Sequence, residues 1–174
     1  MLVLMGVSGS GKTLIGKEVA ARWDAGFEDA DHWHVPEAVA KMSAKIPLTD
    51  EDRAPWLARL RSGVIEATPP GGRMVLACSA LKHRYRDVLR GGDRDVLFIY
   101  LEGTAELIAE RLAGRSGHYM PPELLKSQIA ALEVPGPDEA VTLSIDQTPE
   151  AIAEAVMAVI GAGVQLPGGG SVAG

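Results

Sequence analysis

The first thirteen residues restrict the possible folds of this chain more than any other stretch. An apolar run, MLVLMG, is followed at once by GVSGSGKT, where Gly6, Gly11, Lys12 and Thr13 satisfy the phosphate-loop pattern G-x-x-x-x-G-K-[ST]. Apolar residues then recur at helical spacing through residues 14–20. A strand, a glycine-rich loop and a helix in this order predict a binding site for a nucleoside triphosphate.

Elementary chemistry explains why such a loop contains these residue types. Glycines let the backbone turn so that successive N–H groups point at an anion, and the following helix adds the positive end of its dipole. We expect Lys12 to contact the outer phosphates of ATP and the Thr13 hydroxyl to bind Mg²⁺. The loop residues predicted to bind ATP are Gly6, Ser8, Gly9, Ser10, Gly11, Lys12 and Thr13.

Short apolar stretches bounded by turn residues predict buried strands, and helical patterns separate them. The stretches lie near residues 2–6, 26–30, 73–78, 95–101 and 141–145. This alternation predicts an α/β fold, a five-stranded parallel sheet with helices on both faces.

The length of 174 residues suits a single domain, which we place at residues 1–162. Two stretches, 32–68 and 112–137, exceed a minimal strand-and-helix pattern and are rich in His, Arg, Lys and Pro. Both follow the carboxyl ends of strands, where such folds bind ligands, so we interpret them as a substrate-binding segment and a lid. Residues 163–174 are rich in glycine and lack periodicity, and we expect a flexible tail.

Composition narrows the possible partners and compartments. The formal net charge of −6 argues against a general binder of nucleic acid or of membrane surfaces. The single cysteine, Cys78, excludes an intrachain disulfide and fits a reducing, intracellular compartment. No apolar run approaches the roughly 18 residues that a membrane span needs.

The acidic residues at the end of the second strand separate the classes of phosphate-loop protein. A GTPase would carry an Asn/Thr-Lys-x-Asp guanine reader, and a motor an aspartate after the third strand, where this chain has Cys78 and Ser79. Asp29 and Asp31 instead close the second strand, as in small-molecule kinases. Asp29 would then help to hold Mg²⁺ through water, and Asp31 would accept the proton of an attacking hydroxyl. The alternative is that both are ordinary turn residues.

Several further blocks resemble the small phosphate-loop gluconokinases, and the resemblance runs from Gly6 to about Ile160. It implies a P-loop kinase fold, Mg²⁺-dependent transfer of the terminal phosphate of ATP to the 6-hydroxyl of D-gluconate, and a cytoplasmic homodimer. The matching blocks are GVSGSGKT (6–13), DADHWH (29–34), KM (41–42), PLTDEDRAPWL (47–57), CSALKHRYRDVLR (78–90) and RSGHYMPPELLKSQIAALEVP (115–135).

Gluconate is a carboxylate with many hydroxyls, so its recognition requires cations. Lys82, Arg86 and Arg90 recur at intervals of four and share one helix face, and the first two lie nearest the strand end. We expect Lys82 and Arg86 to hold the substrate, with a solvated basic face as the alternative. Arg53 follows an acidic run that Thr49 caps, a pattern that also fits a plain helix start.

The resemblance implies further roles at matching positions. Lid arginines would lie over the phosphates, with Arg115 stabilising the transferring phosphoryl group and Arg111 beside the nucleotide. Substrate contacts would come from Asp31, His34, Lys41, Arg53, His118 and Gln128.

The chain departs from the resemblance in the block that follows the acidic pair. The family usually reads His-Pro-x-x-Asn, whereas residues 34–38 read HVPEA, and Lys45 replaces a glycine before the Pro-Leu block. One polar contact worth on the order of 1–3 kcal/mol is then missing, which leaves the exact sugar acid open. The alternatives are a kinase for another small hydroxy acid, such as shikimate, and a non-catalytic ATP-binding regulator.

Overall fold

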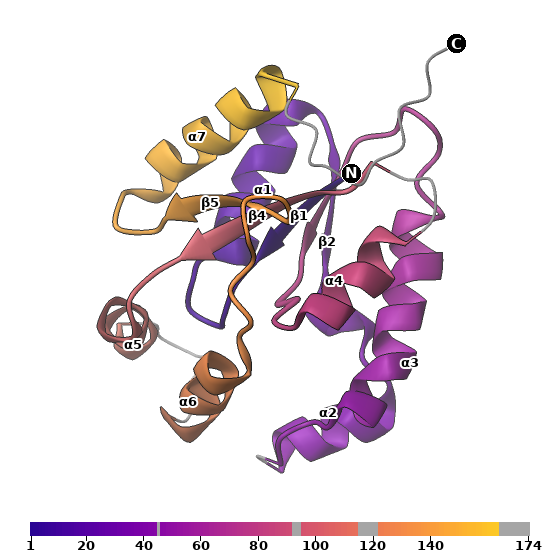
Figure 1. Ribbon diagram of the computed structural model, residues 1–174, viewed down its shortest axis with the longest axis vertical. Helices are drawn as coiled ribbons and strands as arrows, with labels where there is room; N and C mark the ends of the chain where they lie inside the picture. The colour runs from indigo at the N-terminus through magenta and orange to yellow at the C-terminus, as the bar shows by residue number, and fades with distance from the viewer. Residues whose placement is uncertain (45, 92–94, 115–121, 164–174) are drawn as a thin grey trace.

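The centre of the molecule is a five-stranded, fully parallel sheet. The structure is a computed structural model, and it describes residues 1–44, 46–91, 95–114 and 122–163. The strands run in the order β2-β3-β1-β4-β5, which confirms the predicted sheet (Figure 1). Their bounds are β1 Leu2–Met5, β2 Gly26–Asp29, β3 Met74–Ala77, β4 Leu97–Glu102 and β5 Val141–Ser144.

Helices connect the strands and cover both faces of the sheet (Figure 1). Thr148 caps the last helix by accepting from the Ala151 N–H, and Pro149 occupies its first turn, as the sequence predicts. The helices are α1 Lys12–Trp23, the 3₁₀ helix η1 Ala30–Trp33, α2 Pro36–Ser43, α3 Asp50–Leu60, its π-helical continuation η2 Arg61–Ile65, α4 His83–Arg90, α5 Ala105–Ala113, α6 Pro122–Ala131 and α7 Pro149–Gly161.

The alternation of side chains along the strands divides the core into two layers. Val3 and Met5 of β1 point to one face, where they pack with Trp56 of α3 and with side chains of α4. Leu2 and Leu4 point to the other face, toward α1 and α7. Because β1 pairs with β3 on one side and β4 on the other, it is buried throughout and anchors the first residue of the loop that follows it.

The carboxyl ends of the strands share one edge of the sheet, and the connections that leave this edge form the lower part of Figure 1. The phosphate loop follows β1, η1 follows β2, and the segment that enters α4 follows β3. Helices α2, α5 and α6 and the start of α3 lie beyond the same edge (Figure 1). The topology therefore brings the predicted substrate segment and the phosphate loop to one place.

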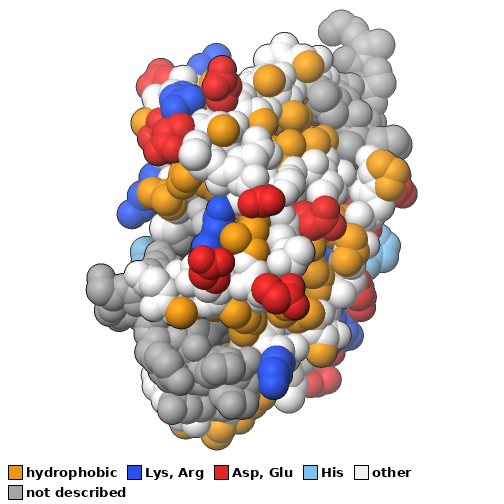
Figure 2. Space-filling view, turned by 90° about the vertical axis from the view of Figure 1, so that its left-hand side faces the viewer, with side chains coloured by type: hydrophobic (Ala, Val, Ile, Leu, Met, Phe, Trp, Pro, Cys, Tyr) orange, Lys and Arg blue, Asp and Glu red, His pale blue; other side chains and the backbone are white. Residues whose placement is uncertain are grey.

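The surface carries charges of both signs, as expected for a chain with a formal net charge of only −6. Figure 2 shows acidic side chains mixed with basic and hydrophobic ones on the face that carries β5 and α5. Within the described ranges, none of the helices has the length and apolarity that a bilayer crossing demands. The predicted tail, apart from its first residue, and the part of the predicted lid at residues 115–121 lie outside the described residues.

Candidate active site

The phosphate loop has a backbone that requires glycine. Gly6, Gly9 and Gly11 adopt φ values of +141°, +87° and +96°, a region that side chains other than glycine rarely enter. A Cβ atom at Gly6 would also lie 2.9 Å from the carbonyl oxygen of Leu101. The phosphate loop therefore has the backbone conformation that its glycines allow, between the end of β1 and the start of α1.

Lys12 folds back over this loop. Its ammonium group donates to the carbonyl oxygens of Gly6 and Val7, each at 2.9 Å. The nearby Ser10 hydroxyl is fully buried, and its oxygen bonds to no described residue. A cation and an unsatisfied hydroxyl at a helix N-terminus suit the binding of phosphate oxygens.

The predicted metal-binding pair lies together beside the loop. The Thr13 hydroxyl donates to the Asp29 carboxylate at 2.8 Å, and the same carboxylate caps η1 by accepting from the Asp31 N–H at 3.1 Å. Hydroxyl and carboxylate oxygens are ligands that Mg²⁺ prefers. The described ranges hold no group of three His, Cys, Asp or Glu side chains placed to bind a metal ion.

Arg111 connects α5 to the segment after β5. Its guanidinium donates to the carbonyl oxygens of Ile145 and Gln147. One of its nitrogens lies 3.9 Å from the position of a Cβ on Gly11, so Arg111 borders the phosphate loop. The other predicted lid residues, Arg115 and His118, lie outside the described residues.

A cavity of about 300 Å³ opens between the starts of α3 and α4 and one side of α6. Three predicted substrate residues from separate elements line it, namely Arg53, Lys82 and Gln128. Asp50 and Tyr85, which the sequence does not predict as substrate contacts, line it as well.

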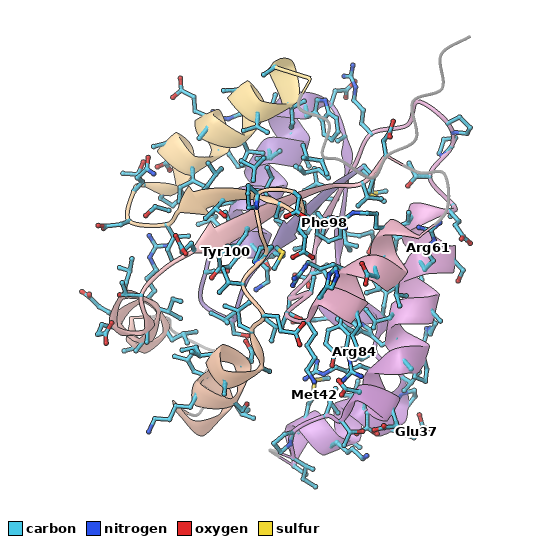
Figure 3. All side chains as sticks on the ribbon, viewed as in Figure 1. Glu37, Met42, Arg61, Arg84, Phe98 and Tyr100 are labelled. Carbon is cyan, nitrogen blue, oxygen red and sulfur yellow. The ribbon has the colours of Figure 1, made fainter. Side chains whose placement is uncertain are left out.

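The Asp50 carboxylate binds most of the basic side chains around this cavity. Lys82 donates to both of its carboxylate oxygens, at 2.9 and 3.1 Å, and the Tyr85 hydroxyl and Arg84 guanidinium also bind it. Figure 3 labels Arg84 on the side of α4 that faces α3. By contrast, the Arg53 guanidinium bonds to no side chain or carbonyl in the described part of the chain. Arg53 is therefore the cation of this wall that an anionic ligand could pair with directly.

His34 and Lys41 lie near the cavity but do not line it. His34 stacks on Trp56 with ring centroids 4.5 Å apart, and burial lowers its pKa against the opposing charge of Asp31, which favours the neutral ring. Its buried Nδ1 bonds to no described group. Lys41 forms an ion pair with Asp52 at 2.6 Å.

The sequence predicts that Arg86 holds the substrate, but the structure buries its side chain against other parts of the protein. Its side chain is 1% exposed, and its guanidinium binds both oxygens of Glu139 at 3.1 and 3.0 Å. Its remaining bonds go to the carbonyl oxygens of Ala80, Leu81 and Glu133. Arg86 thus fastens the segment after α6 to α4 and does not present a charge to an open surface.

Gln128 reaches from α6 to the phosphate loop. Its amide oxygen accepts from the Ser8 N–H at 2.7 Å, and its amide nitrogen donates to the Ser8 hydroxyl at 3.2 Å. Ala38, which replaces the expected asparagine, is 2% exposed in α2. The departure from the motif therefore lies in a packed position.

Comparison with known proteins agrees with this geometry. The profile of the shikimate kinase family matches residues 8–160. A thermosensitive gluconokinase of Escherichia coli K12 is 49% identical over 144 residues, 83% of this chain and 77% of that protein. A gluconokinase of Gluconobacter oxydans is 46% identical over 154 residues, 88% of this chain and 86% of that protein.

Solved structures show the same fold. A gluconokinase from Sinorhizobium meliloti superposes with a TM-score of 0.82 at 39% identity, covering 92% of this chain and 91% of that one. An APS kinase from Mycobacterium tuberculosis reaches 0.67 at 18% identity, covering 92% and 96%, and supports the fold alone. The predicted P-loop kinase fold is confirmed.

Proposed function

This chain belongs to the gluconokinases, within the shikimate kinase family, and we propose that it transfers the terminal phosphoryl group of ATP to the 6-hydroxyl of D-gluconate. The observation that carries the proposal is the cavity beside the phosphate loop, because Arg53 on its wall, which forms no ion pair with a described residue, suits a small carboxylate. The product is 6-phospho-D-gluconate.

The phosphate end of the site uses the backbone of residues 6–13. Its N–H groups hold the phosphates, and Lys12 leaves the loop carbonyls to bind the outer phosphate oxygens. Thr13 and, through water, Asp29 would hold Mg²⁺, which neutralises the charge of the phosphates. Arg111 borders the nucleotide, and Arg115 would stabilise the transferring group.

The acceptor end uses side chains. Arg53 pairs with the gluconate carboxylate, while Lys82 and Tyr85, held by Asp50, bind hydroxyls. Asp31, next to the metal-binding pair, orients the 6-hydroxyl and accepts its proton. Most of the acceleration comes from positioning and charge stabilisation, since phosphoryl transfer needs little covalent help.

Neighbouring residues complete the acceptor end. The neutral His34 has a ring nitrogen left for a hydroxyl, and His118 belongs to the same group of contacts. Lys41 acts by fixing Asp52 at the start of α3. We assign residues 1–162 to one kinase domain, with acceptor recognition in 32–68, a lid at 112–137 and a tail at 163–174, and we propose that the enzyme works as a cytoplasmic homodimer.

The test is coupled ADP release with ATP and Mg²⁺ across D-gluconate, other sugar acids, shikimate and nucleoside monophosphates. We expect turnover selective for D-gluconate and a product phosphorylated at the 6-position. Preference for another acid would move the specificity to the block around His34. Binding of ATP without any acceptor-dependent ADP release would overturn the proposal in favour of a regulator.

A further inference from the structure

Gln128 contacts both the acceptor cavity and the phosphate loop. It lines the acceptor cavity from α6, and its amide makes two hydrogen bonds to Ser8 of the phosphate loop, 120 positions away in the chain. Both bonds use the same planar amide, so the orientation of this side chain and the position of the Ser8 peptide depend on each other.

The Ser8 peptide lies at a sensitive point of the loop. It stands between Gly6 and Gly9, both in the left-handed region of φ, where the backbone has little intrinsic preference for one conformation. The next bond inside the loop, from the Ser10 N–H to the Val7 oxygen, measures 3.2 Å. The bond from Ser8 to Gln128, at 2.7 Å, is therefore an external restraint on the nest of N–H groups that receives phosphate.

The segment just after α6 is bound to the start of α4, on the acceptor side of the site. The Glu133 N–H donates to the Leu81 oxygen at 2.9 Å, and the Glu133 carboxylate accepts from the His83 N–H at 2.6 Å. Arg86 adds a bond to the Glu133 oxygen at 3.0 Å. Helix α6 is thus held at one point by the phosphate loop and at the other by the start of α4, where Lys82 lines the cavity.

We propose that Gln128 is a positioning residue that sets the conformation of the phosphate loop from the wall of the acceptor cavity, and that it acts on nucleotide binding through Ser8. The inference rests on the part of the proposed function in which the phosphate loop binds a nucleotide. It does not depend on which acceptor is phosphorylated. It assigns to Gln128 a role different from the direct substrate contact that the sequence suggests.

The experiment is a calorimetric titration with MgADP, without any sugar acid, of the wild type, Gln128→Leu, Ser8→Ala and the double variant. Leucine has nearly the size of glutamine but makes no hydrogen bond. We expect Gln128→Leu to raise the Kd for MgADP about threefold to tenfold, since it removes both bonds to Ser8. Ser8→Ala removes only the hydroxyl bond and should raise it less. The double variant should match Gln128→Leu, because the two changes remove one shared interaction.

The matched control is Ile129→Ala, an exposed apolar residue of the same helix, which should leave the Kd unchanged. Thermal unfolding of each variant separates a loss of positioning from a loss of folded protein. A Gln128→Leu protein with the wild-type Kd for MgADP but a raised KM for gluconate would overturn the proposal and return Gln128 to direct substrate contact. Strictly additive effects in the double variant would overturn it too. Because MgADP binding needs no acceptor, a failure of the gluconate assignment leaves this test intact.

Discussion

The two halves of the site are built in opposite ways. The phosphate half comes from consecutive residues, 6–13, and works through backbone atoms along a path that requires glycines at positive φ. The acceptor half comes from side chains on α3, α4 and α6, and its central ion pair joins Asp50 and Lys82 across 32 positions.

The two halves also differ in how their charges are used. In the phosphate half the ammonium group of Lys12 donates to the loop carbonyls of Gly6 and Val7. In the acceptor half the acids Asp50 and Asp52 already pair with Lys82, Arg84 and Lys41. In the proposed function, recognition of the gluconate carboxylate there would depend mainly on Arg53, so we expect the two halves to respond differently to the loss of one cation.

The largest effect should come from the scaffold beneath the acceptor half. Arg86→Met removes the guanidinium that binds both oxygens of Glu139 and three backbone carbonyls, which should lower the free energy of unfolding by about 3–5 kcal/mol. Chemical denaturation measures this. The double variant Arg86→Met/Glu139→Gln should recover part of the loss, because it removes the uncompensated charge. An Arg86→Met protein of wild-type stability with a raised KM for gluconate would instead give Arg86 a role in binding.

On the phosphate half, Lys12→Ala should keep the fold and lower kcat by about 10²-fold or more, because it removes a cation from the transferring group. Steady-state kinetics with saturating ATP and gluconate tests this, and circular dichroism checks the fold. Near-normal turnover in the folded variant would remove Lys12 from the mechanism.

On the acceptor half, Arg53→Ala should raise the KM for gluconate by about 10- to 100-fold, the loss expected for one charge-assisted bond. The KM for ATP should stay near its wild-type value, since Arg53 is not in the phosphate loop. Arg59→Ala, an exposed arginine of the same helix, is the control and should change neither value. Equal rises in both KM values would mean that the two halves are not separable in this way.

The smallest effect concerns pH. Burial raises the pKa of the Glu139 carboxyl, but the hydrogen bonds and charge of Arg86, with His83 beside it, outweigh burial and hold this pKa below its ordinary 4.5. Since the pKa is lower in the folded state, the stabilisation is complete above pH 4.5 and is lost as the pH falls through the folded-state value. Wild-type stability should thus fall more steeply on acidification than that of Glu139→Gln, measured by denaturant unfolding at each pH. Parallel curves would contradict this assignment.

Local features of the fold were predictable because their causes are local. The phosphate loop, the strands and the caps at Thr49 and Thr148 follow from residues within a few positions of one another. Arg86 was misread because helical spacing fixes the face of a residue but not what covers that face. The cover is Glu139, which only the return from α6 to β5 brings there.

The cavity was predictable only in part for the same reason. Its three selected residues were found through chemistry and resemblance, while Asp50 looked like an acid placed to favour a helix N-terminus. Nothing near Asp50 in the chain signals that Lys82, Arg84 and Tyr85 converge on it. That convergence requires the start of α3 to lie beside the start of α4.

The parallel sheet, the phosphate loop and the likeness to gluconokinases are predictable from the chain alone, because strand periodicity, loop glycines and contiguous motifs are properties of neighbouring residues. The pairing of Lys82 with Asp50, the burial of Arg86 and the contact between Gln128 and Ser8 become visible only in three dimensions. The physical reason is that side-chain pairing depends on distance in space, and the sheet topology brings together residues that are far apart in the chain.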